Sequence, residues 1–239
     1  MSFLEIDEVT LRFAGLLAVD HVSLRIDEGE MVGLIGPNGS GKTTLLNVLT
    51  GHYGPDSGSV RLEGRPIHGL RPNQVARLGI TRMFQLTRLF RRLSTLDNLI
   101  TAGCAIGLGY GEAQARAASL IEDLGLGEVR DEDGAHLSGG QQKLLEFGCM
   151  FMGAPRLAVL DEPFAAIHPT MREIMVRIIK DRHARGQTFL LVSHDLPAVI
   201  DLGPRLVVMN AGSVIAEGDA ERVLNDREVI EAYLGGAAA

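Results

Sequence analysis

The chain has 239 residues, of which 46% are hydrophobic, so it is long enough to bury the core of one large α/β domain with a smaller subdomain. Its 23 basic and 30 acidic residues give a formal charge of -7, which argues against a general attraction to nucleic acid or anionic lipid. Its two cysteines, Cys104 and Cys149, have no CxxC or metal-type spacing. We therefore expect no nucleic-acid partner, no disulfide framework and a reducing cytosol.

The N-terminal segment 1–13 has neither a basic start nor a continuous apolar run, so we expect no signal peptide there. Apolar Val9, Leu11 and Phe13 alternate with polar residues, which predicts a half-buried strand. No apolar run in the sequence reaches the roughly 18 residues that a membrane-spanning helix needs. If the protein serves a membrane, it docks there through a partner.

A glycine-rich loop follows an apolar strand predicted over 30–35 and precedes a helical run over 45–49. The loop matches GxxxxGK[ST] in the strand-to-helix context that this motif requires. Its glycines let backbone N–H groups turn into one concavity, while Lys42 brings a charge to the β- and γ-phosphates and Thr43 offers a hydroxyl to Mg²⁺. A simple connecting turn is the alternative. The residues expected to hold the nucleotide are Gly36, Asn38, Gly39, Ser40, Gly41, Lys42, Thr43 and Thr44.

The apolar run 80–84 leads to Gln85 at the entry to the middle of the chain. A side-chain amide here can contact both a bound Mg²⁺ and the water that attacks a phosphate. A solvent-facing glutamine is the alternative for this position.

The middle of the chain, from 95 to 151, contains helical stretches rich in Ala, Leu and Gly and no clear strand. We therefore predict a single domain over 1–239. Its core comprises 1–94 and 152–239, and a helical subdomain of about 95–151 is inserted into it.

A second candidate anion site opens a helix within this helical region. Ser138 is followed three residues later by Gln141, which is a capping box, and Gly139 and Gly140 leave the helix N-terminus bare. A hydroxyl, exposed N–H groups and the helix dipole can together bind an anion. Because the chain already has a complete phosphate loop, we expect this second site to serve the ATP of another subunit. An ordinary capped helix is the alternative.

Two adjacent carboxylates, Asp161 and Glu162, end an apolar strand predicted over 156–160. Open α/β sheets bind their ligands at the carboxyl ends of such strands. Successive residues point in opposite directions, so Asp161 can reach a Mg²⁺ shell while Glu162 polarises the attacking water. Asp-Glu after a strand usually forms a solvated turn or the start of a helix. The presence of a phosphate loop in the same chain favours a catalytic role instead.

A further apolar strand, predicted over 189–192, ends at Ser193, His194 and Asp195. His194 should lie at the same edge of the sheet, where it could hydrogen-bond a γ-phosphate, although a surface loop histidine is the alternative. Together with a fourth strand over 205–209, these short apolar segments separated by helices predict a largely parallel buried sheet and hence an α/β fold.

These motifs resemble, in their order along the chain, those of an ABC transporter ATPase. They are the phosphate loop, Gln85, Leu-Ser-Gly-Gly-Gln at 137–141, Leu-Asp-Glu-Pro at 160–163 and Ser-His-Asp at 193–195. The resemblance covers nearly the whole chain. It implies an α/β fold with a P-loop NTPase (RecA-like) core, an antiparallel β part and an inserted helical subdomain.

The same resemblance implies the ligands and the assembly. ATP and Mg²⁺ are expected in the site, with Phe13 stacked on adenine, and a core strand position is the alternative for Phe13. Two ATPase subunits, identical or homologous, would enclose two ATP molecules head to tail between phosphate loops and the residues 138–141. His168 stands where many ABC ATPases carry an aspartate, which puts the cross-interface contact of that position in doubt.

Within the family, the segments 15–20, 76–85 and 229–235 resemble ATPases of branched-chain amino-acid importers, and 145–150 is closer to urea or amide importers. This implies ATP hydrolysis coupled to transport, with transmembrane permease subunits as partners and, indirectly, a solute-binding protein. It also implies a peripheral place on the cytoplasmic face of the inner membrane.

Two other functions compete with import. A soluble ABC ATPase acting on nucleic acid, ribosomes or cofactor assembly is opposed by the absence from the sequence of long heptad helices and of a second cassette. A non-catalytic nucleotide-binding regulator is opposed by the presence of Lys42, Asp161, Glu162 and His194.

Overall fold

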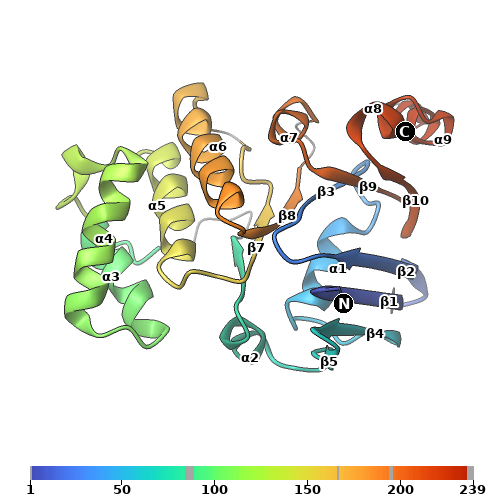
Figure 1. Cartoon of the computed structure of the whole chain (residues 1–239), viewed down its shortest axis with the longest axis horizontal. Helices are drawn as coiled ribbons and strands as arrows, with labels where there is room; N and C mark the ends of the chain where they lie inside the picture. The colour runs from blue at the N-terminus through green and yellow to red at the C-terminus, as the bar shows by residue number, and fades with distance from the viewer. Residues whose placement is uncertain (1, 84–88, 166, 194–195, 236–239) are drawn as a thin grey trace.

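A six-stranded sheet forms the centre of the molecule (Figure 1). The computed structural model describes residues 2–83, 89–165, 167–193 and 196–235. All strand pairs in this sheet are parallel except the pair that joins its first two strands. In sheet order the strands are β10 (Ser213–Gly218), β9 (Arg205–Asn210), β3 (Met31–Ile35), β8 (Thr188–Val192), β7 (Leu157–Asp161) and β6 (Ile80–Met83).

Burial on both faces explains why the central strands of this sheet are mostly apolar. Every residue of β3, β7 and β8 is buried, because helices cover the sheet from both sides. The four strands expected from the sequence are confirmed, each within one residue at either end. The largely parallel order is confirmed as well.

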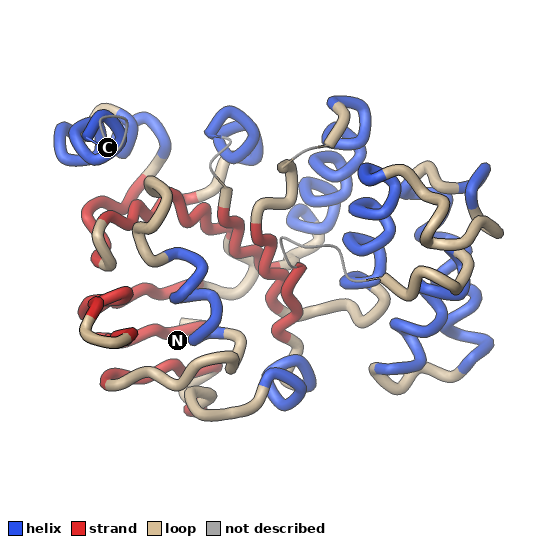
Figure 2. Tube along the Cα trace, turned by 180° about the vertical axis from the view of Figure 1, so that it is seen from behind, coloured by secondary structure: helices blue, strands red, loops and turns tan. Residues whose placement is uncertain are grey.

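A second, antiparallel sheet lies beside the first (Figure 1). Its strands are β2 (Leu16–Ile26), β1 (Leu4–Phe13), β4 (Ser57–Leu62) and β5 (Arg65–Pro66). The helix α1 (Lys42–Leu49) runs between the two sheets (Figure 2). Its buried Leu45, Leu46 and Leu49 belong to one apolar cluster with residues of both sheets, so α1 is held from two sides. The expected antiparallel part is confirmed.

Three helices pack together at the far end of the molecule, and a fourth lies between them and the sheet (Figure 1). They are α3 (Thr95–Ala105), α4 (Tyr110–Leu124), α5 (Gly139–Phe151) and α6 (Pro169–Ala184), and a short 3₁₀ helix covers Gly127–Val129. Buried residues of α4 recur at helical spacing and face this cluster. Phe151 of α5 contacts Phe189 of β8, with ring centroids 6.4 Å apart. The limits of a separate subdomain stay a prediction.

The remaining helices are α2 (Pro72–Arg77), α7 (Leu196–Leu202), α8 (Ala220–Leu224) and α9 (Arg227–Gly235). Within the part of the chain that the structure describes, no helix combines the length and hydropathy that crossing a bilayer requires.

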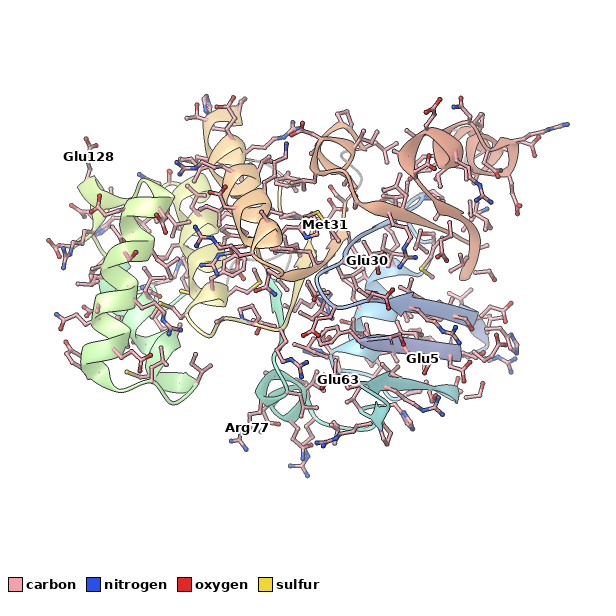
Figure 3. The ribbon with its side chains drawn as sticks, in the orientation of Figure 1. Glu5, Glu30, Met31, Glu63, Arg77 and Glu128 are labelled. Atoms are coloured by element: carbon pink, nitrogen blue, oxygen red, sulfur yellow. The ribbon has the colours of Figure 1, made fainter. Side chains whose placement is uncertain are left out.

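An ion pair links the amino ends of two central strands, β3 and β9. Glu30 lies next to Met31 at the start of β3 (Figure 3), and Arg205 at the start of β9 donates to its carboxylate, with 2.6 Å between Nε and Oε1. Arg205 also donates to the carbonyl of Arg25 at 2.6 Å. These bonds join the two sheets at the end opposite to the phosphate loop.

Candidate nucleotide site

The phosphate loop connects β3 to α1, and its glycines are required by its backbone. Gly36, Gly39 and Gly41 have φ angles of 144°, 79° and 102°, which residues with a side chain rarely adopt. A Cβ on Gly36 would lie 2.1 Å from the carbonyl oxygen of Met209, and one on Gly41 would lie 2.4 Å from that of Ala18. Glycine therefore lets the loop curl tightly against the neighbouring strands. The helix that follows begins at Lys42, three residues earlier than the sequence predicts.

Lys42 is buried at the base of this loop. Its Nζ donates to the carbonyl oxygens of Gly36 at 2.8 Å and Pro37 at 2.9 Å, and to Ser40 Oγ at 3.2 Å. Burial lowers the pKa of Lys42, and the negative charges of Glu162 and Asp161 act in the opposite direction. The ammonium is thus held beside the loop amides, where phosphate oxygens would be stronger acceptors than these carbonyls.

The loop opens into a cavity of about 670 Å³, a volume suited to a small-molecule ligand. Residues 38–44 line it together with Phe13, Leu16, Glu162 and others. Phe13 is 41% exposed and packs edge-on against Tyr53, with ring centroids 5.2 Å apart. The alternative that Phe13 is a core residue is therefore wrong. An exposed aromatic ring at the rim of this cavity can contact a planar base.

Asp161 ends β7 beneath the loop, and its carboxylate has a partner that the sequence interpretation missed. Arg82 on the neighbouring strand β6 donates from Nη2 to Asp161 Oδ2 at 2.6 Å, and from Nη1 to Asn47 Oδ1 of α1 at 2.7 Å. The signal was an arginine placed between buried Ile80 and Met83, because a charge in a buried strand needs a partner. Arg82 therefore belongs to the site.

Glu162 follows Asp161 with a positive φ of 51°, which is uncommon for a residue with a side chain. Its backbone N–H donates to the carbonyl of Val192 at 2.8 Å, and its Oε2 accepts from Ser193 Oγ at 3.2 Å. Asp161 and Val192 are partners in the parallel β7–β8 pair, which places the two strand ends side by side. The structure thus brings Glu162 to the cavity that the phosphate loop lines.

Ser138 caps α5 as expected. Its Oγ accepts from the N–H of Gln141 at 3.4 Å, and Gln141 Oε1 accepts from the N–H of Ser138 at 2.9 Å, so the predicted capping box is confirmed. Ser138 and Gly139 are exposed. Among the described residues that line the phosphate-loop cavity, none comes from 138–141. The residues of the second candidate anion site therefore lie outside the phosphate-loop cavity of their own chain.

His168 is the N-cap of α6, and Pro169 is the first residue of that helix. His168 Nδ1 accepts from the N–H of Thr170 at 3.4 Å. The side chain thus caps its own helix. Many ABC ATPases carry an aspartate at this position, and the sequence put the cross-interface contact of that aspartate in doubt. Gln85 and His194 lie outside the described residues, so their roles stay predictions.

Comparison with known families and proteins gives consistent matches. The family described as "ABC transporter" matches residues 19–165, and the one described as "Branched-chain amino acid ATP-binding cassette transporter" matches residues 213–239. The high-affinity branched-chain amino acid transport ATP-binding protein BraF of Pseudomonas aeruginosa is 38% identical, and LivG of Escherichia coli is 37% identical. Each match covers 98% of both chains.

Solved structures agree with these matches. A nucleotide-free ATP-binding cassette from an ABC transporter has a TM-score of 0.87 and 32% identity. The ADP conformation of the cassette MJ1267 has a TM-score of 0.86 and 32% identity, and both cover 98% of this chain and 99% of the other. The family resemblance of the sequence is thus confirmed by matches over more than half of the chain and by full-length relatives: this chain is an ATP-hydrolysing member of the ABC transporter family.

Proposed function

We propose that this chain is the ATPase subunit of an importer for branched-chain amino acids or related small amides. The observation that carries the proposal is the match of residues 213–239 to the branched-chain family, in a chain that also has a complete phosphate loop. BraF and LivG, which are similar over their full lengths, are named as branched-chain amino acid transport ATP-binding proteins. This match opposes an ABC ATPase that acts on nucleic acid or in cofactor assembly.

ATP would bind in the phosphate-loop cavity. The N–H groups of the loop and the N-terminus of α1 would hold the phosphates, and Lys42 would move its ammonium from the loop carbonyls to the β- and γ-phosphate oxygens. Phe13 would stack on the adenine at the rim of the cavity. The binding energy then comes mainly from the phosphates, so ADP would also bind.

Two oxygen-bearing residues near the phosphate loop suit Mg²⁺. Thr43 is exposed near the start of α1, and the buried carboxylate of Asp161 lies at the end of β7. The described residues include no group of three or more His, Cys, Asp or Glu side chains that could hold a metal alone, which fits a cation that shares its ligands with substrate phosphates. We propose Thr43, Asp161 and Gln85 as its protein ligands. When bound, Mg²⁺ would neutralise charge that develops on the phosphate oxygens.

Hydrolysis would depend on Glu162. Its carboxylate would orient a water molecule and accept its proton, while the water oxygen bonds to the γ-phosphorus and the bond to the β,γ-bridging oxygen breaks. ADP and phosphate are the products. Ser193 holds Oε2 of Glu162 at 3.2 Å, which limits the rotation of the carboxylate. Gln85 and His194 are proposed to contact the water and the γ-phosphate.

The complete site would need a second subunit. Ser138, Gly139, Gly140 and Gln141 would bind the γ-phosphate of ATP held by the phosphate loop of the partner ATPase, because they lie apart from the cavity of their own chain. Separate transmembrane permease subunits would hold the ATPase pair at the cytoplasmic face of the inner membrane. A solute-binding protein would act indirectly, through the permeases.

Purification of the tagged chain with its native membrane partners tests this function. We expect permease subunits to copurify and ATP turnover to rise when a solute-binding protein loaded with leucine, isoleucine or valine is added. Lys42→Ala, which removes the phosphate-binding charge, is the matched control and should show no turnover. Copurification of ribosomes or DNA without permeases would contradict import. Stimulation by urea or a short amide alone would reassign the solute.

A further inference from the structure

Three polar groups of Glu162 form hydrogen bonds, and their partners come from two different parts of the chain. The backbone N–H donates to Val192 and the carboxylate accepts from Ser193, both on the β8 side of the site. The carbonyl oxygen accepts instead from Lys143 Nζ at 2.9 Å, and Lys143 belongs to α5. Because Glu162 has a positive φ of 51°, its conformation depends on such surrounding contacts.

Lys143 is buried and uses its ammonium within the protein. It is 7% exposed, and Nζ donates to the carbonyl oxygens of Glu162 at 2.9 Å and Ala165 at 2.7 Å. Burial lowers the pKa of Lys143, while the negative charges of Glu146 and Glu162 act against that change. The two accepting carbonyls belong to the segment directly after β7, so one side chain joins α5 to the turn that carries the candidate base.

A second contact joins α5 to the helix α6, which follows this segment in the sequence. A Cβ on Gly140 would lie 2.3 Å from the sulfur of Met171 in α6, so the first turn of α5 packs closely on α6. The first turn of α5 also carries Ser138 as its N-cap, which is the candidate contact to the ATP of a second subunit. The segment 162–165 and the helix α6 that follows it therefore both contact α5.

We propose that Lys143 is a positioning residue that ties α5, the helix of the second anion site, to the backbone of Glu162. The inference rests on the proposed function of Glu162 as the base and of Ser138 as the contact to the partner's ATP. When Ser138 engages that ATP, α5 carries Lys143 with it, and Lys143 sets the position of Glu162 in its own site. Binding of ATP in one site would thereby change the position of Glu162 in the other site.

Lys143→Met in the full chain tests the inference, because methionine keeps the apolar stem and removes the ammonium. We expect kcat to fall by about 10-fold to 100-fold with KM and the Kd for ATP-Mg unchanged, since misplacing a reacting group affects the chemical step. Turnover is normalised to subunits that bind ATP. Lys180→Met, at an exposed lysine of α6, should keep the parent kcat. Leu144→Ala, next to Lys143 in the core, should lower the thermal midpoint and keep kcat per folded subunit.

A double-mutant cycle separates positioning from a general structural effect. In a Glu162→Gln background, Lys143→Met should cause no further loss in single-turnover hydrolysis, because its effect passes through the carboxylate that is already absent. A further loss by the same factor, an equal loss of kcat in Leu144→Ala, or a parent kcat in Lys143→Met would each overturn the inference. A parent rate in Glu162→Gln alone would instead refute the assignment of the base.

Discussion

Arg82 and Asp161 form a buried ion pair beneath the phosphate loop. Nη2 of Arg82 lies 2.6 Å from Oδ2 of Asp161, and the two side chains are only 5% and 4% exposed. Arg82 also bonds Asn47 of α1, so the pair joins α1, β6 and β7. The strand that carries Arg82 leads to Gln85. The side chain of Arg82 therefore joins the carboxylate proposed as a Mg²⁺ ligand to the strand that precedes Gln85, another proposed ligand, in the sequence.

We predict that Arg82→Met lowers the free energy of unfolding by about 3–5 kcal/mol, because it leaves the buried charge of Asp161 without its partner. Urea unfolding followed by circular dichroism measures the change. Adding Asp161→Asn should recover part of the loss, since the uncompensated charge is then removed. Arg227→Met, which breaks the exposed pair with Glu231, is the control and should change little. Equal effects of the two arginine variants would contradict the prediction.

Glu162→Gln should separate nucleotide binding from hydrolysis. It keeps the size and one carbonyl oxygen of the side chain and removes the charge that would polarise water, so turnover should fall by about 100-fold or more while ATP still binds. The ATP-bound dimer should then accumulate. Light scattering is expected to give a dimer with ATP-Mg and a monomer without it. Hydrolysis at the parent rate would show that another group is the base.

Ser138→Arg should abolish that dimer when it is added to Glu162→Gln. A bulky cation at the N-terminus of α5 opposes the helix dipole and fills the anion site. Ser57→Arg adds the same charge at an exposed serine of β4 and should leave the dimer intact. Light scattering with ATP-Mg compares the two. If the dimer persists in the variant with Ser138→Arg, Ser138 does not contribute to the ATP-bound dimer.

His168 should behave as a helix cap. His168→Ala should lower the free energy of unfolding by about 1 kcal/mol, because the N–H of Thr170 loses its acceptor. His168→Asp supplies another acceptor and should retain the parent stability. Thermal unfolding is expected to show a decrease of about 2–4 °C for the alanine variant alone. Identical midpoints for the alanine and aspartate variants would count against a capping role.

The two cysteines should react at very different rates. Cys104 is exposed, whereas burial and the charge of Glu146 raise the pKa of Cys149 to about 12. At pH 8 the Cys149 thiol stays protonated, and the thiolate is the reactive form. A thiol reagent should therefore label one group quickly in the native chain and two after denaturation. Cys104→Ser should remove the fast phase; if the fast phase survives, Cys149 is more accessible than its surroundings indicate.

Local motifs carried much of the information on the site before the fold was known. The phosphate loop and the capping box of α5 were predictable, because each depends on contiguous residues whose backbone conformation and hydrogen bonds are local. The four buried strands were predictable from short apolar runs. The capping role of His168 is also local, because its ring nitrogen accepts from the N–H of Thr170, two residues later.

By itself, the sequence determined which residues can bind phosphate, accept a proton or cap a helix, since those properties follow from residue type and short spacing. The tertiary structure alone decided that Arg82 meets Asp161, which is 79 positions away, and that Lys143 holds the carbonyl of Glu162. Both contacts depend on the order of β3, β8, β7 and β6 and on the packing of α5 against the segment after β7. No local pattern encodes that order, because it results from burying all of these elements in shared apolar clusters.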